Sequence, residues 1–330
     1  MAQDRYQYHD YFLMDDLLSE EHKLVMSSVR EWVKKEVSPI VEDYCQRAEF
    51  PKQWIKGLAE IGAFGPYIPA EYGGGGMDQI AYGLIMMELE RGDSGLRSTA
   101  SVQSSLVMYP IFTYGTEEQK RKYLPKLASG DMMGCFGLTE PDHGSNPGGM
   151  LTNIKDKGDH YLLNGTKNWI TNGGTASVYI VMAQTDVAKG SKGINALIVE
   201  KGMPGFTVGP KENKLGIRGS DTHSLMFSDV KVPKENRIGE DGFGFKFAMK
   251  TLSGGRIGIA AQALGIASGA YELALAYSKE RKAFGKTISQ HQAIQFKLAD
   301  MATEIDAARL LCMKAAWLKD QHEDYALASS

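Results

Sequence analysis

The chain has 330 residues, 43% of them hydrophobic and 23% charged, and a formal net charge of −3, a composition typical of a globular protein with one or a few domains. The weak net charge does not favour nucleic-acid binding, and no apolar run is expected to be long enough to cross a membrane. Three widely spaced cysteines argue against a disulfide framework or a metal site, and a polar N-terminus unlike a signal or transit peptide favours a bacterial-type cytoplasmic protein.

The first third of the chain is predicted to be helical. Residues 20–37, 50–63 and 79–91 place apolar side chains at helical spacing, with charged side chains on the opposite faces. Thr116, followed by two glutamates, has the features of the N-cap of a further helix. We therefore predict an N-terminal helical domain over residues 1–131.

The next segment, residues 132–238, has the pattern of short strands. Turn pairs such as Asn164-Gly165 and Pro204-Gly205 separate runs of β-prone residues. The runs are 161–163, 178–183, 195–199 and 224–227. Regularly spaced short strands predict a small β-barrel or sandwich as the middle domain.

The last segment, residues 239–330, is predicted to be helical again, with long helices over 245–277 and 287–319. Two amphipathic helices cannot enclose a core by themselves. The chain also ends at Ser330 in a sequence that resembles the approach to another helix. We therefore expect a partial C-terminal helical bundle, from either a fragment or a naturally shortened protein, and an α+β fold for the whole chain.

Two unusual motifs stand about twenty residues apart in the middle segment. Residues 135–150 read C-F-G-L-T-E-P-D-H-G-S-N-P-G-G-M, and residues 169–174 read W-I-T-N-G-G. After a short apolar strand, the prolines and glycines of the first motif prevent a regular strand or helix. The hydroxyls of Thr139, Ser145 and Thr171 and the tryptophan ring then predict a pocket for a flat, hydrogen-bonding ring. The alternative for either motif alone is a turn-flanked strand with a core tryptophan.

These motifs resemble those of the acyl-CoA dehydrogenases, flavoproteins that use FAD to desaturate acyl-CoA thioesters, and the resemblance covers essentially all 330 residues. It extends to K-L-G-I-R-G-S at 214–220, G-G-R-I-G-I-A at 254–260 and R-K-A-F-G-K at 281–286. The resemblance implies FAD as cofactor, an acyl-CoA substrate and a place in fatty-acid or amino-acid catabolism. It also implies electron-transfer flavoprotein as redox partner and a homotetramer assembled through the C-terminal bundle.

The resemblance also implies individual contacts. For FAD these are Phe136, Leu138, Thr139, Gly144, Ser145, Trp169, Ile170 and Thr171, together with Arg281, Phe284 and Gln292, of which Arg281 and Gln292 match positions that reach the FAD of a neighbouring subunit. For acyl-CoA they are Glu90, Arg97, Ser98, Ser145, Ser253, Gly254, Gly255 and Arg256. Without the resemblance, Arg281 would be interpreted as a solvated helix charge.

The general base is not found in the sequence. Family members most often carry a catalytic glutamate in a Tyr-Glu-Gly motif, which does not occur here; the nearest match, Tyr271-Glu272-Leu273, lies inside a predicted helix. Some relatives place the glutamate at the position of Gly255. The chain is therefore predicted to lack its own base and to have little dehydrogenase activity, whereas its full-length parent would be active.

The acyl specificity is predicted from two parts of the chain. Residues 90–98 and 101–105 resemble glutaryl-CoA dehydrogenase, in which an arginine matching Arg97 would bind the second carboxylate. The alternative for Arg97 is a surface salt bridge to Asp93 or Glu90. The C-terminal half resembles short-chain (butyryl) acyl-CoA dehydrogenase, so glutaryl-CoA is the first expected substrate and butyryl-CoA the second.

Three other functions stay open on the sequence alone. The first is a catalytically silent flavin-binding protein, and the second is an acyl-CoA oxidase, which shares the pocket motifs but transfers electrons to oxygen. A scaffold without flavin is the third, and it leaves both motif-rich loops without an explanation.

Overall fold

The computed structural model describes residues 9–330, which divide into two compact units. The helical unit contains the described residues up to 38, residues 78–93 and residues 256–330. The sheet unit contains residues 39–77 and 94–255. Each unit therefore combines segments that are far apart in the sequence.

The helical unit begins with a capped helix pair. Ser19 starts α1 because its side chain accepts the backbone N–H of His22 and the His22 ring accepts the backbone N–H of Ser19. Asp78 caps α4 in a similar way, through the N–H of Ala81. These caps confirm the predicted helices near residues 20 and 79. The elements are η1 (Met14–Leu17), α1 (Glu20–Trp32), the π-helical turn η2 (Val33–Val37) and α4 (Gln79–Gly92).

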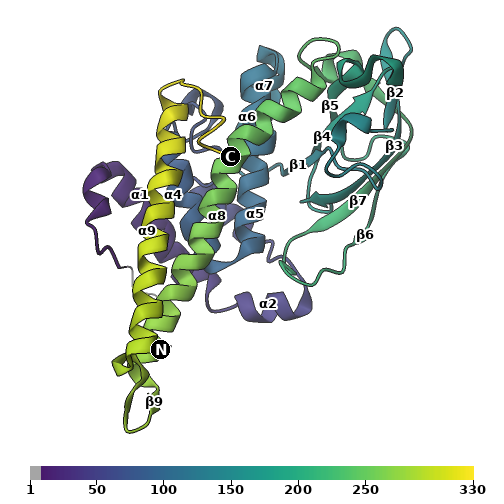
Figure 1. The fold of residues 1–330 in the computed structure, drawn as a ribbon. Helices are drawn as coiled ribbons and strands as arrows, with labels where there is room; N and C mark the ends of the chain where they lie inside the picture. The colour runs from purple at the N-terminus through teal and green to yellow at the C-terminus, as the bar shows by residue number, and fades with distance from the viewer. Residues whose placement is uncertain (1–8) are drawn as a thin grey trace. The chain divides into compact units, whose positions relative to one another are not determined.

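Two long helices, α8 (Gly244–Glu280) and α9 (Gln292–Asp320), lie side by side in Figure 1 and are joined by a small hairpin. Ile257 of α8 packs in one buried cluster with Ala315 and Ala316 of α9, whose small side chains allow close approach. The second helix begins later than predicted because the preceding residues pair as a hairpin. That hairpin consists of β9 (Lys282–Ala283), β10 (Lys286–Thr287) and the 3-10 turn η8 (Ile288–Gln290).

The length and composition of α8 bear on the expectation that the chain has no membrane span. In the described part of the chain, α8 is the one helix that is long and apolar enough to cross a membrane by length and composition alone. The core helix of a soluble protein can have the same length and composition, and α8 is partly buried inside the protein. The helix also carries the buried, ion-paired Glu272.

The sheet unit contains a row of short helices. Thr116 caps α7 as predicted, in a reciprocal capping box with Gln119. The helix predicted over 50–63 is shorter, because Pro51 precedes it and Gly62, at φ 73°, follows it. The helices are α2 (Val41–Arg47), α3 (Trp54–Glu60), η3 (Ala70–Tyr72), α5 (Ser94–Ser101), the π-helical η4 (Val102–Met108), α6 (Tyr109–Tyr114) and α7 (Glu117–Ala128).

The predicted strands are all present and belong to one eight-stranded sheet (Figure 1). The strands are β1 (Gly134–Gly137), β2 (Asn153–Asp156), β3 (His160–Thr171), β4 (Val178–Gln184), β5 (Ile194–Glu200), β6 (Phe206–Lys211), β7 (Thr222–Pro233) and β8 (Arg237–Ile238). Their order is β6-β7-β3-β2-β4-β5-β8, with β1 parallel to β4. Every residue of β4 is buried, which fits its unbroken apolar run.

Candidate functional site

The two motifs identified in the sequence close around one cavity of the sheet unit, with a volume of about 420 Å³. We call it the sheet-unit cavity. Its lining consists of Val102, Leu106, Phe136, Leu138, Thr139, Gly144, Ser145, Pro147, Trp169, Ile170, Thr171, Met249 and Leu252. A cavity of this size and mixed lining is typical of a small-molecule or cofactor site.

Three hydroxyls of the lining can bond to a ligand. The side chains of Thr139, Ser145 and Thr171 have no hydrogen-bond partner among residues 9–330. On the apolar side, the Phe136 ring stacks at 6.5 Å on that of Phe247, which fixes its position. The cavity therefore combines available polar groups with rigid apolar walls.

The W-I-T-N-G-G motif owes its shape to backbone irregularity. The pairing of β3 with β7 shifts between Lys167 and Ile170, and Trp169 adopts a left-handed φ of 61° within this bulge. The bulge leaves the Trp169 side chain 58% exposed at the cavity while Ile170 is buried. Asn172, also left-handed, donates through Nδ2 to the carbonyl oxygen of Gly134 at 3.1 Å. The asparagine thus anchors the turn to β1.

Glycine is required at the second glycine position of the same motif, Gly174, for a steric reason. A Cβ at Gly174 would lie 2.6 Å from Nε2 of His223. That ring contacts the carbonyl oxygen of Gly209 at 2.7 Å and the Asp221 carboxylate at 2.8 Å. His223 pairs with Ile170 across β3 and β7, so this contact supports the strand behind the cavity.

A buried ion pair lies next to the cavity lining. Lys167 of β3 donates to the Glu140 carboxylate at 2.8 Å, and the two side chains are 0% and 3% exposed. Burial lowers the pKa of Lys167 to about 8 against the attraction of Glu140. Burial raises the pKa of Glu140, but the Lys167 charge and the Leu151 amide outweigh it, so the net pKa lies below the usual value. Both groups are therefore charged near neutral pH.

Two helices form the remaining wall. Val102 and Leu106 come from η4, and Met249 and Leu252 from α8. These apolar residues were missed by the sequence analysis, although the four-residue spacing of the first pair is a helical signal. Gly255 follows Leu252 by about one turn of α8, and a Cβ at this position would lie 3.7 Å from Cδ2 of Leu106.

The predicted FAD contacts fall into two groups. Eight of them line the sheet-unit cavity: Phe136, Leu138, Thr139, Gly144, Ser145, Trp169, Ile170 and Thr171. Arg281, Phe284 and Gln292 belong to the helical unit and are exposed, Phe284 by 96%. The structure therefore brings the first group together, and a role for the second in a neighbouring subunit stays a prediction.

The predicted substrate contacts are more scattered. Ser145 lines the cavity; Ser98 lies four residues before Val102, and Ser253, Gly254 and Gly255 follow Leu252 on α8. Arg256 is exposed and donates to Oγ of Ser330 at 2.9 Å, so its role as a substrate contact stays a prediction.

The two predicted substrate contacts of opposite charge are both buried. Arg97 is 3% exposed in α5, so it does not lie at the surface, and it is not among the residues that line the sheet-unit cavity. Glu90 is 4% exposed in α4, and it belongs to the helical unit whereas Arg97 belongs to the sheet unit.

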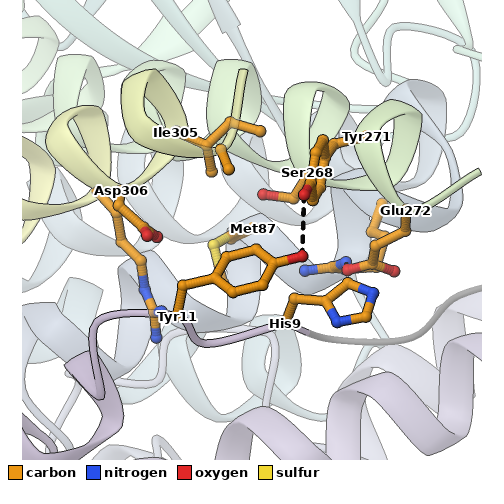
Figure 2. Close-up of a pocket in the computed structure, with 11 residues that line it drawn as sticks. His9, Tyr11, Met87, Ser268, Tyr271, Glu272, Ile305 and Asp306 are labelled. Atoms are coloured by element: carbon orange, nitrogen blue, oxygen red, sulfur yellow. Dashed lines mark hydrogen bonds and ion pairs between the residues drawn. The ribbon is translucent and has the colours of Figure 1, made fainter. Parts of the chain in front are cut away.

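A second pocket lies in the helical unit and is drawn in Figure 2. It holds only about 30 Å³, the room of one or two water molecules. The Tyr11 and Tyr271 hydroxyls hydrogen-bond at 2.9 Å at its edge. Glu272, from the Tyr-Glu-Leu run, is ion-paired with the buried Arg91. This glutamate therefore has a structural partner, and the pocket is too small for a thioester substrate.

Comparison with known proteins places the whole chain in one family. It matches the acyl-CoA dehydrogenase N-terminal domain over residues 19–131, the middle domain over 135–230 and the C-terminal domain over 242–329. The short-chain specific acyl-CoA dehydrogenase of Clostridium acetobutylicum is 46% identical over 316 residues, which are 95% of this chain and 83% of that protein.

Two solved structures are similar as well. Butyryl-CoA dehydrogenase from Megasphaera elsdenii has a TM-score of 0.92 and 45% identity, over 94% of this chain and 82% of that chain. A glutaryl-CoA dehydrogenase from Mycobacterium smegmatis in complex with FADH2 has a TM-score of 0.90 and 40% identity, over 94% of this chain and 79% of that chain. From its three matched domains, its relatives and its fold, the chain belongs to the acyl-CoA dehydrogenase family.

Proposed function

We propose that the chain binds FAD in the sheet-unit cavity and serves in an enzyme that desaturates short-chain acyl-CoA thioesters. The observation that carries this proposal is the meeting of the two motifs around one cavity of about 420 Å³ with three available hydroxyls. The cavity is large enough for a ring system. Family membership and the FADH2-bound relative support the same cofactor.

The residues present fit the flavin ring. Thr139 and Thr171 can hydrogen-bond its polar edge, while Trp169 and Phe136 provide aromatic surface beside it. When bound, FAD would accept the hydride from the β-carbon of the acyl chain. The apolar side chains of η4 and α8 exclude water from the opposite wall.

The proton of the α-carbon needs a base that the lining does not supply. No aspartate or glutamate is among the residues that line the cavity within the described chain. General-base catalysis contributes about 10²–10⁴-fold. We therefore propose that the 330-residue chain turns over slowly by itself. A homotetramer and electron-transfer flavoprotein as electron acceptor belong to the same proposal.

Purified chain incubated with FAD tests the binding step. We expect flavin absorption that persists after gel filtration, and turnover of butyryl-CoA with an artificial electron acceptor far below that of a short-chain family enzyme. Absence of flavin bands after FAD addition would remove the proposal. Oxygen consumption in step with turnover would favour the oxidase instead, and flavin binding without any turnover would favour a silent flavoprotein.

Glutaryl-CoA is the second candidate substrate, and the likeness to a solved glutaryl-CoA dehydrogenase supports it. A buried guanidinium can bind a terminal carboxylate through two hydrogen bonds. In a chain supplied with a base, we expect Arg97→Ala to reduce kcat/KM for glutaryl-CoA by about tenfold or more while butyryl-CoA changes little. Equal losses on both substrates would exclude this role.

A further inference from the structure

One side chain, that of Glu140, connects the two ends of the loop that contributes Gly144 and Ser145 to the cavity. The Glu140 carboxylate accepts the backbone N–H of Leu151 at 2.6 Å through Oε2 and that of Thr152 at 2.9 Å through Oε1. The two ends of the loop are therefore joined by a residue that does not itself line the cavity.

Lys167 ties the same loop to β3. Its ammonium group donates to Oε1 of Glu140 at 2.8 Å and to the carbonyl oxygen of Leu138 at 3.1 Å. The next residue along β3, Asn168, donates its N–H to the carbonyl oxygen of Thr139 at 2.9 Å. Thr139 is consequently held by its own backbone and by both of its chain neighbours.

Stability alone is a poor reason for such a pair. Removing two charges from water costs several kcal/mol per ion, and apolar residues of similar volume often replace a buried ion pair without loss. The groups that face the Lys167 ammonium are the Glu140 carboxylate, the Leu138 carbonyl and the Met150 thioether. All three belong to the segment 138–150, which follows β1 and contains Gly144 and Ser145.

We propose that Lys167 and Glu140 are positioning residues for the flavin, which hold Thr139 and the loop of Gly144 and Ser145 in their binding geometry. This inference rests on the proposed function of the cavity. It assigns a role to the glutamate of T-E-P and to a lysine of β3, neither of which lines the cavity.

The test compares Lys167→Met with the double variant Lys167→Met/Glu140→Gln. The single variant leaves a buried unpaired carboxylate, so we expect lower stability toward urea. We also expect FAD affinity to fall by about tenfold to a hundredfold, as metal affinity does when the residues that orient metal ligands are lost. The double variant removes both charges, and its stability should largely recover. Its FAD affinity should stay low and its visible flavin circular dichroism should stay altered, because Leu138 and Glu140 have lost the Lys167 ammonium and Thr139 is held only through its own carbonyl oxygen.

Arg91→Met/Glu272→Gln is the matched control, since it neutralises a buried ion pair of the helical unit that does not contact the lining. It should leave FAD affinity and the flavin spectrum within about twofold of the unmodified chain at temperatures where it is folded. If Lys167→Met/Glu140→Gln recovered FAD affinity as well as stability, the inference would be overturned. Failure of the unmodified chain to bind FAD would instead reject the proposed function.

Discussion

At the scale of single residues, the site depends on positions where one residue must both adopt a particular backbone conformation and provide a particular side chain. Asn172 combines a left-handed φ of 64° with a side-chain donor that reaches Gly134, and asparagine is one of the few residues suited to both. Gly255 is the opposite case, because it stands beside the wall of the cavity and offers no side chain.

We predict that Gly255→Glu introduces a general base. A Cβ at this position meets Leu106 at an ordinary contact distance of 3.7 Å, so the helix can accept a side chain there. Glutamate also favours a helix over glycine by up to about 1 kcal/mol. Turnover of butyryl-CoA by the FAD-loaded variant should rise about tenfold or more, and Gly255→Gln, which has the same shape without a base, should not increase it.

The buried Lys167 also predicts a pH dependence of stability. Its pKa is about 8 in the folded chain and near 10.5 when unfolded, so between these values the unfolded state binds more protons. The free energy of unfolding should therefore gain roughly 1–3 kcal/mol from Lys167 as the pH rises from about 8 to 10.5, and nothing below about 7. Urea unfolding of the chain and of Lys167→Met across this range measures the difference. Parallel pH profiles of the two proteins would contradict it.

At the scale of elements, the cavity is set by the packing of β1 against the π-helical η4. The Gln103 side chain accepts the N–H of Gly134 and donates to the carbonyl oxygens of Leu127 and Met132, which fixes the start of the strand. Gly134 allows the close approach, since a Cβ there would lie 2.5 Å from Cγ1 of Val107.

Gly134→Ala should separate β1 from η4. The overlap with Val107 has to be relieved by a shift, which costs about 1–3 kcal/mol of stability and displaces the wall formed by Val102 and Leu106. Urea unfolding should show the loss, and FAD affinity should fall with it. The control is Gly83→Ala in α4, where a Cβ has open space; it should be neutral or slightly stabilising.

At the scale of the whole molecule, segments distant in sequence build each unit. The backbone N–H of Gln79 donates to the Asp320 carboxylate at 2.8 Å, across 241 residues. The helical unit also carries Arg281 and Gln292 as exposed side chains, and Phe284 at a left-handed φ of 53° in the β9–β10 hairpin. The family resemblance implies that Arg281 and Gln292 reach the FAD of a neighbouring subunit.

We predict that FAD binding depends on assembly of the chain into an oligomer. If Arg281 reaches the cofactor of a neighbouring chain, FAD retention should increase with protein concentration in parallel with oligomer formation in sedimentation. Arg281→Ala should weaken FAD binding about tenfold at concentrations where the chain is assembled, and should have no effect where it is monomeric. Lys282→Ala, an adjacent exposed cation, is the control. A loss that is independent of concentration would exclude the intersubunit contact.

Much of this protein follows from local sequence. The apolar periods predicted the long helices, the β-prone runs predicted the strands of the sheet, and Thr116 predicted the start of α7, because each depends on neighbours within one or two turns of chain. The two motifs by themselves predicted a pocket with Thr139, Ser145, Trp169 and Thr171, and the family resemblance added four more of the residues that line it.

Only the tertiary structure decided the rest. The sequence did not predict the apolar wall of η4 and α8, the burial of Arg97 or the pairing of Lys167 with Glu140. Each depends on contacts between segments whose spacing in the sequence does not indicate that they meet. Lysine is rarely fully buried unless it is paired, and only the tertiary structure brings the Glu140 carboxylate to Lys167. Local propensity therefore determined the elements and the motifs, whereas long-range packing determined which side chains meet.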